Sequence, residues 1–321
     1  MSVLGKHGYG AYNPMYVYTQ EYIQVTLEDA IRQNESWIRE WELRHNRFGC
    51  LYKTKTTHAG RMLELEIYPS FTNRRDYIRA IKEQKTGSAQ QKQNTKNAQR
   101  KLVRLIQANF VTGDIAFTAG FTDDRQPKDI EECKRIIKNY FSTLKYHSKK
   151  AGEKGIKYIY VIEQTANKNV RQKYHVHMIM NRGSGANIHG IDIRDWIESK
   201  WRGGDYDNTR RLQWKQDRGG FTGISKYITK QFETLYDTER SGLRHWGQSL
   251  GLRQWTKPPT ESYSRFGKRK VAGLIKKQAA MKTEFEKEYP GFEYLEDFPC
   301  EIRYSDVIDG FYLYCRIYRR E

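Results

Sequence analysis

The sequence predicts an α+β fold, in which a small antiparallel sheet carries helices packed on it. Three segments have the apolar patterns of β-strands: 114–121, 156–163 and 174–181. In 127–149 and 192–201, apolar residues instead recur at helical spacing. Strands and helices that follow one another in this order favour a layer of helices on one sheet.

The N-terminal third contains fewer signals. Arg61–Tyr68 alternates aliphatic with charged residues, which predicts a half-exposed strand that ends at Pro69. From Phe71 to Phe110 there are ten basic residues and two acidic ones. Within this stretch, Thr86–Gln99 is a polar run that cannot bury a core, and we interpret it as an exposed loop or linker. Its surface either contacts phosphates or is simply solvated.

The later elements complete the expected sheet. Pro127 suits the first turn of the first helix. The pattern predicts a short strand at Arg211–Lys215 and a third helix at Gly220–Tyr236. Arg265–Lys277 is a helix-like run with six basic and no acidic residues, and Phe311–Tyr318 is a closing strand.

These patterns divide the chain into three parts: an N-terminal accessory region with a basic linker (1–99), a central domain (100–240) and a basic C-terminal accessory region (241–321). A net charge of +19 indicates a polyanionic partner. Nucleic acid is favoured over a membrane, because no stretch approaches the roughly 18 apolar residues of a spanning helix. The N-terminus lacks a hydrophobic signal core, so we expect a cytoplasmic protein.

A histidine pair lies on the strand 174–181. Side chains alternate along a strand, so His175 and His177 point to one face and Val176 to the other. Glu163 ends the preceding strand and would lie beside His175 if the two strands form a hairpin. Two imidazoles and a carboxylate leave open positions on a divalent ion such as Mg²⁺ or Mn²⁺. Structural histidines and a surface carboxylate remain the alternative.

A tyrosine and a lysine follow on the expected third helix. Tyr227 falls at the edge of its apolar stripe, with Lys230 one turn later. A neighbouring cation favours the phenolate and could help to hold a phosphate. The spacing Tyr-x-x-Lys also occurs at Tyr52 and Tyr146, so only its position after the histidine strand distinguishes Tyr227.

The order of these features resembles the HUH endonuclease superfamily. Phe110–Thr118, then Glu163, the pair His175 and His177, and finally Tyr227 with Lys230 match the arrangement in rolling-circle replication initiators (Rep proteins). In relaxases the tyrosine precedes the histidines. The resemblance covers roughly residues 100–235 and implies an RRM-like or ferredoxin-like sheet with N- and C-terminal extensions.

The resemblance also implies roles for single residues. His175 and His177 would bind Mg²⁺ or Mn²⁺ with Glu163 as third ligand, although Gln231 stands where related transposases supply one. Tyr227 would be the nucleophile and Lys230 its partner. The residues expected to bind DNA are Arg100, Lys101, Arg104, Lys226, Lys268, Arg269 and Lys270.

The implied reaction is a nick in a single-stranded or hairpin origin. It leaves a 5′-phosphotyrosine and a free 3′-hydroxyl, which primes synthesis. Position 223 is glycine, so the chain has a single tyrosine in this motif; a second protomer of a homodimer on the origin, water, or reuse of Tyr227 would close the circle. No Gly-x-x-x-x-Gly-Lys-Ser/Thr loop occurs, which implies that a host helicase unwinds the DNA for a host polymerase.

Two other functions fit the same residues. The first is an HUH transposase or mobilisation nickase, which has the same site but another biological use. The second is a sequence-specific DNA-binding protein without catalysis, in which the histidines are structural. The resemblance places the chain in a bacterial host cell, encoded by a plasmid, a phage or another mobile element.

Overall fold

The computed structural model describes residues 16–18, 50–71, 87–153, 155–164, 173–181, 187–188, 190–212, 221, 246–305 and 310–320. They form an α+β structure, as the sequence predicts. The chain divides into two compact units, of which unit 1 comprises residues 1–91 and 255–321 and unit 2 comprises residues 92–254. None of the described helices is long and apolar enough to cross a membrane.

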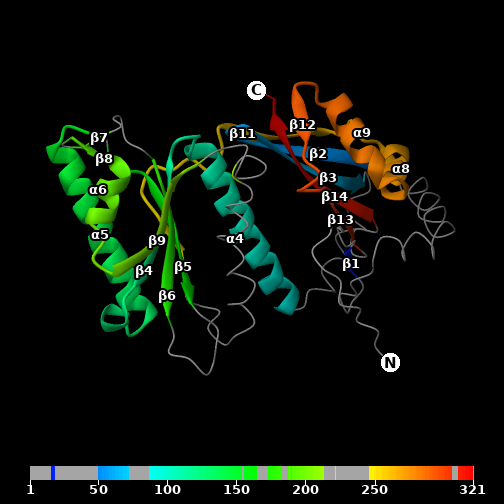
Figure 1. Ribbon diagram of the computed structural model, residues 1–321. Coiled ribbons are helices and arrows are strands. Elements are labelled where there is room, and N and C mark those ends of the chain that lie inside the picture. Colours follow the sequence, from blue (N-terminus) through cyan, green and yellow to red (C-terminus); the bar gives the residue numbers. More distant parts are fainter. Residues whose placement is uncertain are drawn as a thin grey trace. The chain divides into compact units, whose positions relative to one another are not determined.

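Unit 2 is built on a five-stranded antiparallel sheet (Figure 1). In spatial order its strands are β10 (Trp246–Gln248), β5 (Tyr158–Gln164), β6 (Tyr174–Met180), β4 (Ile115–Phe121) and β9 (Gly204–Arg211). The helices are α4 (Gly87–Asn109), which begins in unit 1, α5 (Ile130–Lys150) and α6 (Ile193–Ser199), with a 3-10 turn, η1 (Asp123–Arg125), before α5. Two short strands, β7 (Asn187–Ile188) and β8 (Ile191–Asp192), pair with each other.

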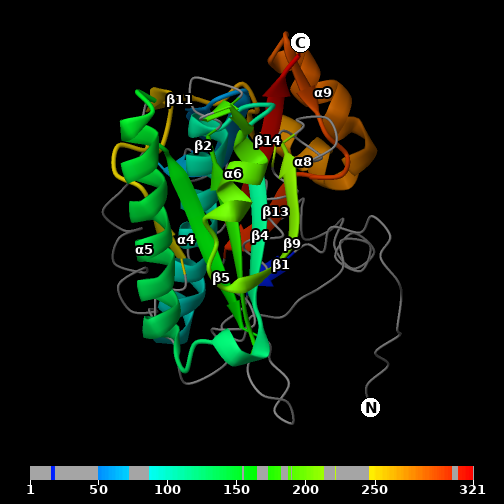
Figure 2. The ribbon, with the colours of Figure 1, turned by 60° about the vertical axis from the view of Figure 1, so that its left-hand side comes forward.

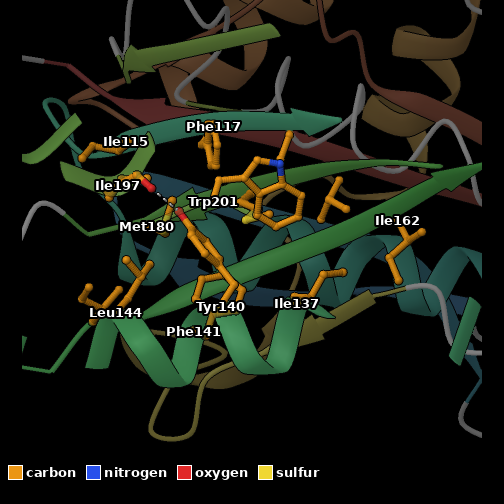
Figure 3. Close-up of a cluster of buried hydrophobic side chains, with 14 of the residues drawn as sticks. Ile115, Phe117, Ile137, Tyr140, Phe141, Leu144, Ile162, Met180, Ile197 and Trp201 are labelled. Carbon is orange, nitrogen blue, oxygen red and sulfur yellow. Dashed lines mark hydrogen bonds between the residues drawn. The ribbon is translucent and has the colours of Figure 1, made fainter. Parts of the chain in front are cut away.

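Helices cover both faces of this sheet. Figures 1 and 2 show α5 and α6 on one side and α4 on the other. The α5/α6 side is the larger apolar cluster (Figure 3), in which the Tyr140 hydroxyl donates to the Ile197 carbonyl at 3.1 Å. On the α4 side, Leu102, Leu105 and Ile106 pack on the sheet. Each strand therefore supplies alternate residues to two cores, which explains why β4 and β6 are almost wholly buried.

The predicted strands β4, β5 and β6 and the helices α5 and α6 are confirmed to within a few residues. The helix expected to begin at Pro127 begins later, at Ile130. The Asp129 carboxylate accepts a hydrogen bond from the Glu132 amide at 2.8 Å and so caps the first turn.

The last strand of unit 2 was predicted in the wrong place. The short strand expected at Arg211–Lys215 is instead β9, which ends at Arg211. This edge strand pairs only with β4 among the described strands and carries little apolar alternation, because Tyr206 is its only large apolar residue. A half-buried edge strand of this kind leaves almost no periodic signal in the sequence.

The interpretation of Thr86–Gln99 as a loop or linker is wrong for residues 87–99, which form the first half of α4. Glutamine, lysine and alanine are good helix formers, so a polar run of them can continue a helix that is anchored elsewhere. The second half of α4 provides that anchor by burying Leu102, Val103 and Ile106.

Unit 1 combines the two ends of the chain. Its sheet has the order β1 (Tyr16–Tyr18), β13 (Glu301–Ser305), β14 (Gly310–Arg319), β3 (Met62–Phe71), β2 (Cys50–Ala59) and β11 (Lys257–Tyr263), with β12 (Phe292–Tyr294) paired to β14. The helices α8 (Lys268–Lys276) and α9 (Met281–Glu288), joined by the 3-10 turn η2 (Gln278–Ala280), pack on one face. The accessory regions expected at each end of the chain thus share one core, because β14 pairs with β3.

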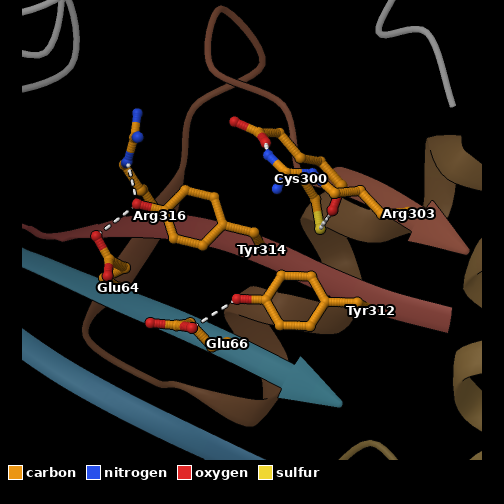
Figure 4. A network of polar contacts seen from close by, with 8 residues as sticks. Glu64, Glu66, Cys300, Arg303, Tyr312, Tyr314 and Arg316 are labelled. Carbon is orange, nitrogen blue, oxygen red and sulfur yellow. Dashed lines mark hydrogen bonds and ion pairs between the residues drawn. The ribbon is translucent and has the colours of Figure 1, made fainter. Parts of the chain in front are cut away.

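Two details of unit 1 differ from prediction. The strand expected to end at Pro69 continues to Phe71. Beyond Ile67, β2 is the one partner of β3 among the described strands, so the missing amide hydrogen of Pro69 is tolerated as at an edge. The strand is also not half-exposed: Glu64 is fully buried (0 % exposed) and accepts a hydrogen bond from the Tyr314 hydroxyl (Figure 4).

That hydrogen bond belongs to a polar network on the face opposite α8 and α9. The Arg316 Nε donates to the Tyr314 oxygen at 3.0 Å, and the Tyr312 hydroxyl donates to Glu66 at 2.6 Å (Figure 4). A buried carboxylate is costly unless it is hydrogen-bonded. The network therefore fixes the register in which β3 and β14 pair.

Candidate metal centre on the sheet of unit 2

The histidine pair lies on the α4 side of the sheet, where the face changes from apolar to polar. Strand register defines three successive cross-strand rows on this side. The apolar row is Ile159, Ile179 and Ala116 from β5, β6 and β4; the mixed row is Val161, His177 and Thr118; and the polar row begins with Glu163 and His175. As the sequence predicted, β5 and β6 pair so that Glu163 lies opposite His175.

His177 is the buried member of the group, with 6 % of its surface exposed. Its Nε2 lies 2.7 Å from the Glu163 Oε2, and its Nδ1 lies 3.3 Å from the Thr118 Oγ1. Both ring nitrogens therefore have polar neighbours from the two adjacent strands. A buried imidazole held in this way has a fixed orientation, which a ligand or a general base requires.

The Thr118 hydroxyl can serve either tautomer of His177. When Nε2 carries the proton, it donates to the Glu163 carboxylate and Nδ1 accepts from the hydroxyl. When Nε2 is unprotonated and free to bind a cation, Nδ1 carries the proton and donates to the same oxygen. The arrangement is therefore compatible with a metal ion on Nε2. Sequence reasoning missed Thr118, although a polar residue between Phe117 and Ala119 on an apolar strand was a signal.

The third predicted ligand is near but not joined to the pair. His175 is partly exposed and lies in the same cross-strand row as Glu163. Across the described ranges, no group of three His, Cys, Asp and Glu side chains stands ready to hold a metal ion. The donor types fit Mg²⁺ or Mn²⁺, but the His175 ring must turn about its side-chain bonds to join His177 and Glu163.

The predicted nucleophile lies outside the described residues, as do Lys226, Lys230, Gln231 and nearly all of the helix expected at Gly220–Tyr236. The two residues that bracket this segment are described. Phe221 and Trp246 both pack in the apolar cluster on the α4 side, together with Ile179 of the histidine strand. The chain therefore leaves and re-enters the described structure on the histidine side of the sheet.

The tyrosines that the structure describes in unit 2 belong to the opposite side. Tyr140 and Tyr174 are in the α5/α6 cluster, with Tyr158 and Tyr160 packed against it. Tyr206 lies against Phe117 of that cluster, and Tyr146 is exposed on α5. Burial raises the pKa of Tyr140 and of Tyr158, which disfavours their phenolates.

Comparison with known proteins gives one match, at this site. Residues 114–232 match the model of a family described as replication-associated protein ORF2. This is a family of rolling-circle replication initiators, and the similarity associates the chain with DNA replication. The match spans less than half of the chain. No curated protein and no solved structure matches the sequence.

The region that matches the replication-associated family contains β4, β5, β6 and β9, and so all three cross-strand rows. It also contains Tyr227 and Lys230. It does not contain α4 or unit 1, so the basic residues predicted there to bind DNA have no support from the similarity.

Those basic residues divide into two groups. On α4, Lys101 is exposed, with its ammonium 6.0 Å from the centre of the Trp246 ring, while Arg100 and Arg104 are partly buried. On α8, Arg269 is exposed. Lys270, by contrast, lies 2.7 Å from Glu284 and 2.6 Å from Glu288 of α9, and these carboxylates raise its pKa against the effect of burial.

Lys270 therefore serves mainly to join α8 to α9. Lys268 begins α8 and is partly exposed. The exposed cations of this region are better represented by Arg269, Lys276 and Lys277.

Proposed function

We propose that the protein is a metal-dependent endonuclease that initiates replication by nicking single-stranded DNA at an origin through Tyr227. The observation that supports this most is the contact between His177 Nε2 and Glu163 Oε2, at 2.7 Å on a face that also carries His175. The family match across the same residues gives the contact its context.

In this proposal His175, His177 and Glu163 hold Mg²⁺ or Mn²⁺, with Gln231 as the rival third ligand. The bound cation would polarise the scissile phosphate and neutralise its developing charge. Thr118 holds the His177 ring in position in either tautomer. The apolar row covered by α4 limits the access of water to one end of the site.

The position of Phe221 and Trp246 supports the choice of Tyr227. Both ends of the segment lie on the histidine side, and Tyr227 follows only six positions after Phe221, so the phenol can reach that face. The phenolate oxygen would form a bond to phosphorus while the bond to the 3′ oxygen breaks. The leaving oxygen takes up a proton, which gives a 5′-phosphotyrosine and a free 3′-hydroxyl. Lys230 would favour the phenolate.

The proposed biological setting is rolling-circle replication in a bacterial cell. The 3′-hydroxyl primes a host polymerase, a host helicase unwinds the duplex, and the phosphotyrosine bond allows the strands to be rejoined without ATP. A homodimer could supply the second tyrosine for that step.

A denaturing gel tests the proposal. The full chain is mixed with single-stranded oligonucleotides and Mn²⁺, and a covalent shift of the protein is scored. We expect an adduct that is lost in Tyr227→Phe and kept in Tyr236→Phe, a matched control from the same segment. An adduct that survives in Tyr227→Phe contradicts the assignment. Salt-dependent DNA binding without any adduct would favour a non-catalytic DNA-binding protein.

A further inference from the structure

Gly120 is a residue of β4 that the backbone does not require to be glycine. The described glycines with positive φ do not include it. Glycine inside a strand weakens the strand and often marks a close approach by another group. The reason for a glycine here must therefore be space.

The space beside Gly120 is filled by one side chain. A Cβ atom at position 120 would lie 3.2 Å from Oδ2, 3.5 Å from Cγ and 3.6 Å from Cβ of Asp205, and these are its three nearest neighbours. Asp205 stands opposite Gly120 in the register of β9 with β4. Residues directly opposite in an antiparallel pair project to the same face, so Asp205 lies on the histidine side.

The same row continues to His175. The pairing of β4 with β6 runs from Thr118 opposite His177 to Ala119 opposite Val176, and one further step sets Gly120 beside His175. The polar row is therefore Glu163, His175, Gly120 and Asp205 across four strands. The missing side chain at position 120 leaves an imidazole and a carboxylate on either side of one gap.

Both of these side chains lack a partner. Within the part of the chain that the structure describes, neither His175 nor Asp205 has a hydrogen bond or ion pair. His177 and Glu163 already contact each other. An unpaired carboxylate beside an unpaired imidazole, next to a His–Glu contact, is a donor set for a hard divalent cation.

We propose that Asp205 is a further ligand of the metal ion at this site, and that Gly120 is the residue that gives its carboxylate access. The inference rests on the proposed metal site of His175, His177 and Glu163. A second carboxylate enriches the site in oxygen and negative charge, which favours Mg²⁺ and Mn²⁺ over zinc.

Calorimetric titration of the full chain with Mn²⁺ tests this ligand. We expect Asp205→Asn to lower the Mn²⁺ affinity about tenfold or more, since the number and charge of ligands set affinity. Gly120→Ala should lower it similarly, because the new Cβ displaces the carboxylate. In the double variant the losses should not add, since both changes remove one interaction. Asp195→Asn is the control: its carboxylate is exposed on α6, across the sheet, and its loss should change nothing.

His177→Ala separates the two levels of the proposal. If His177→Ala loses Mn²⁺ while Asp205→Asn binds it as the parent does, this inference is overturned and the proposed site stands. Unchanged binding in both variants overturns the site and the inference together. A loss in Gly120→Ala without a loss in Asp205→Asn also overturns it, because the glycine would then act on something other than the carboxylate. Circular dichroism of each variant confirms that it is folded.

Discussion

The substitution Glu163→Gln separates a metal ligand from a structural partner of His177. The two side chains have the same shape, and the amide oxygen can still accept the hydrogen bond that now joins Glu163 Oε2 to His177 Nε2. The change removes the negative charge and so the affinity for a cation. We expect a small effect on stability and a large effect on Mn²⁺ binding.

The stability effect follows from the contact. A hydrogen bond to a charged group contributes about 1.5–3 kcal/mol and a neutral one about 0.5–1.5 kcal/mol. The Glu163 side chain is 29 % exposed, so water weakens the difference, and a loss of about 1 kcal/mol or less remains. For a chain of this size that lowers the melting temperature by roughly 2–4 °C.

The effect on the metal is larger and can be measured in the same melts. At a Mn²⁺ concentration of about 100 times the dissociation constant, the parent gains about 2.7 kcal/mol from binding. If Glu163→Gln weakens binding about 100-fold, the same concentration adds only about 0.4 kcal/mol. Glu131→Gln is the control, because Glu131 is an exposed glutamate on α5 that pairs with Lys134. Equal Mn²⁺ stabilisation of the parent and Glu163→Gln would refute Glu163 as a ligand and leave Gln231 to be tested.

Three further predictions concern neighbouring residues. Thr118→Val should weaken Mn²⁺ binding about tenfold, since the hydrogen-bond partners of metal-bound histidines act on this scale, and calorimetry showing full affinity would exclude a role for the hydroxyl. Lys270→Gln should lower the melting temperature by a few degrees because it breaks contacts with α9; an unchanged melt would mean these ion pairs contribute nothing. Replacing Arg269, Lys276 and Lys277 together with glutamine should reduce the slope of log affinity against log salt for single-stranded DNA by about 0.7 per lost phosphate contact, whereas an unaltered slope would place the DNA elsewhere.

The sequence predicted those elements whose own residues carry the signal. β4 and β6 alternate between two apolar cores, and α5 buries residues at helical spacing, so each could be recognised alone. The first half of α4 was misread because its stability comes from its second half. β9 was misplaced because one edge pairing with β4 supplies most of its contacts.

Contacts between distant strands could not be predicted in the same way. The pairing of β3 with β14 joins residues about 250 positions apart, and no local pattern specifies that partner. Glu163 and His175 were an exception, because a hairpin of neighbouring strands fixes their register. The approach of Asp205 to Gly120 depends on the register of an edge strand, and a lone glycine within a strand was its only signal.

The three rows on the α4 side give the strongest physical reason to regard this site as functional. Ile159, Ile179 and Ala116 show that α4 can cover this face with apolar residues alone. The sheet nevertheless changes within two rows to His177, Glu163 and Thr118, and then to His175, Gly120 and Asp205. A nearly buried histidine costs free energy unless its nitrogens are bonded, and replacing such polar groups by apolar ones of similar shape is often neutral or stabilising.

Stability alone therefore does not explain this change of character. If the polar row were only structural, its members would satisfy one another, as Glu64, Tyr314 and Arg316 do in unit 1. Here the His177–Glu163 contact is made, while His175 and Asp205 stand without partners among the described residues. A cross-strand row that is half-satisfied in this way is complete only with a bound cation, and that is the state in which the site is proposed to act.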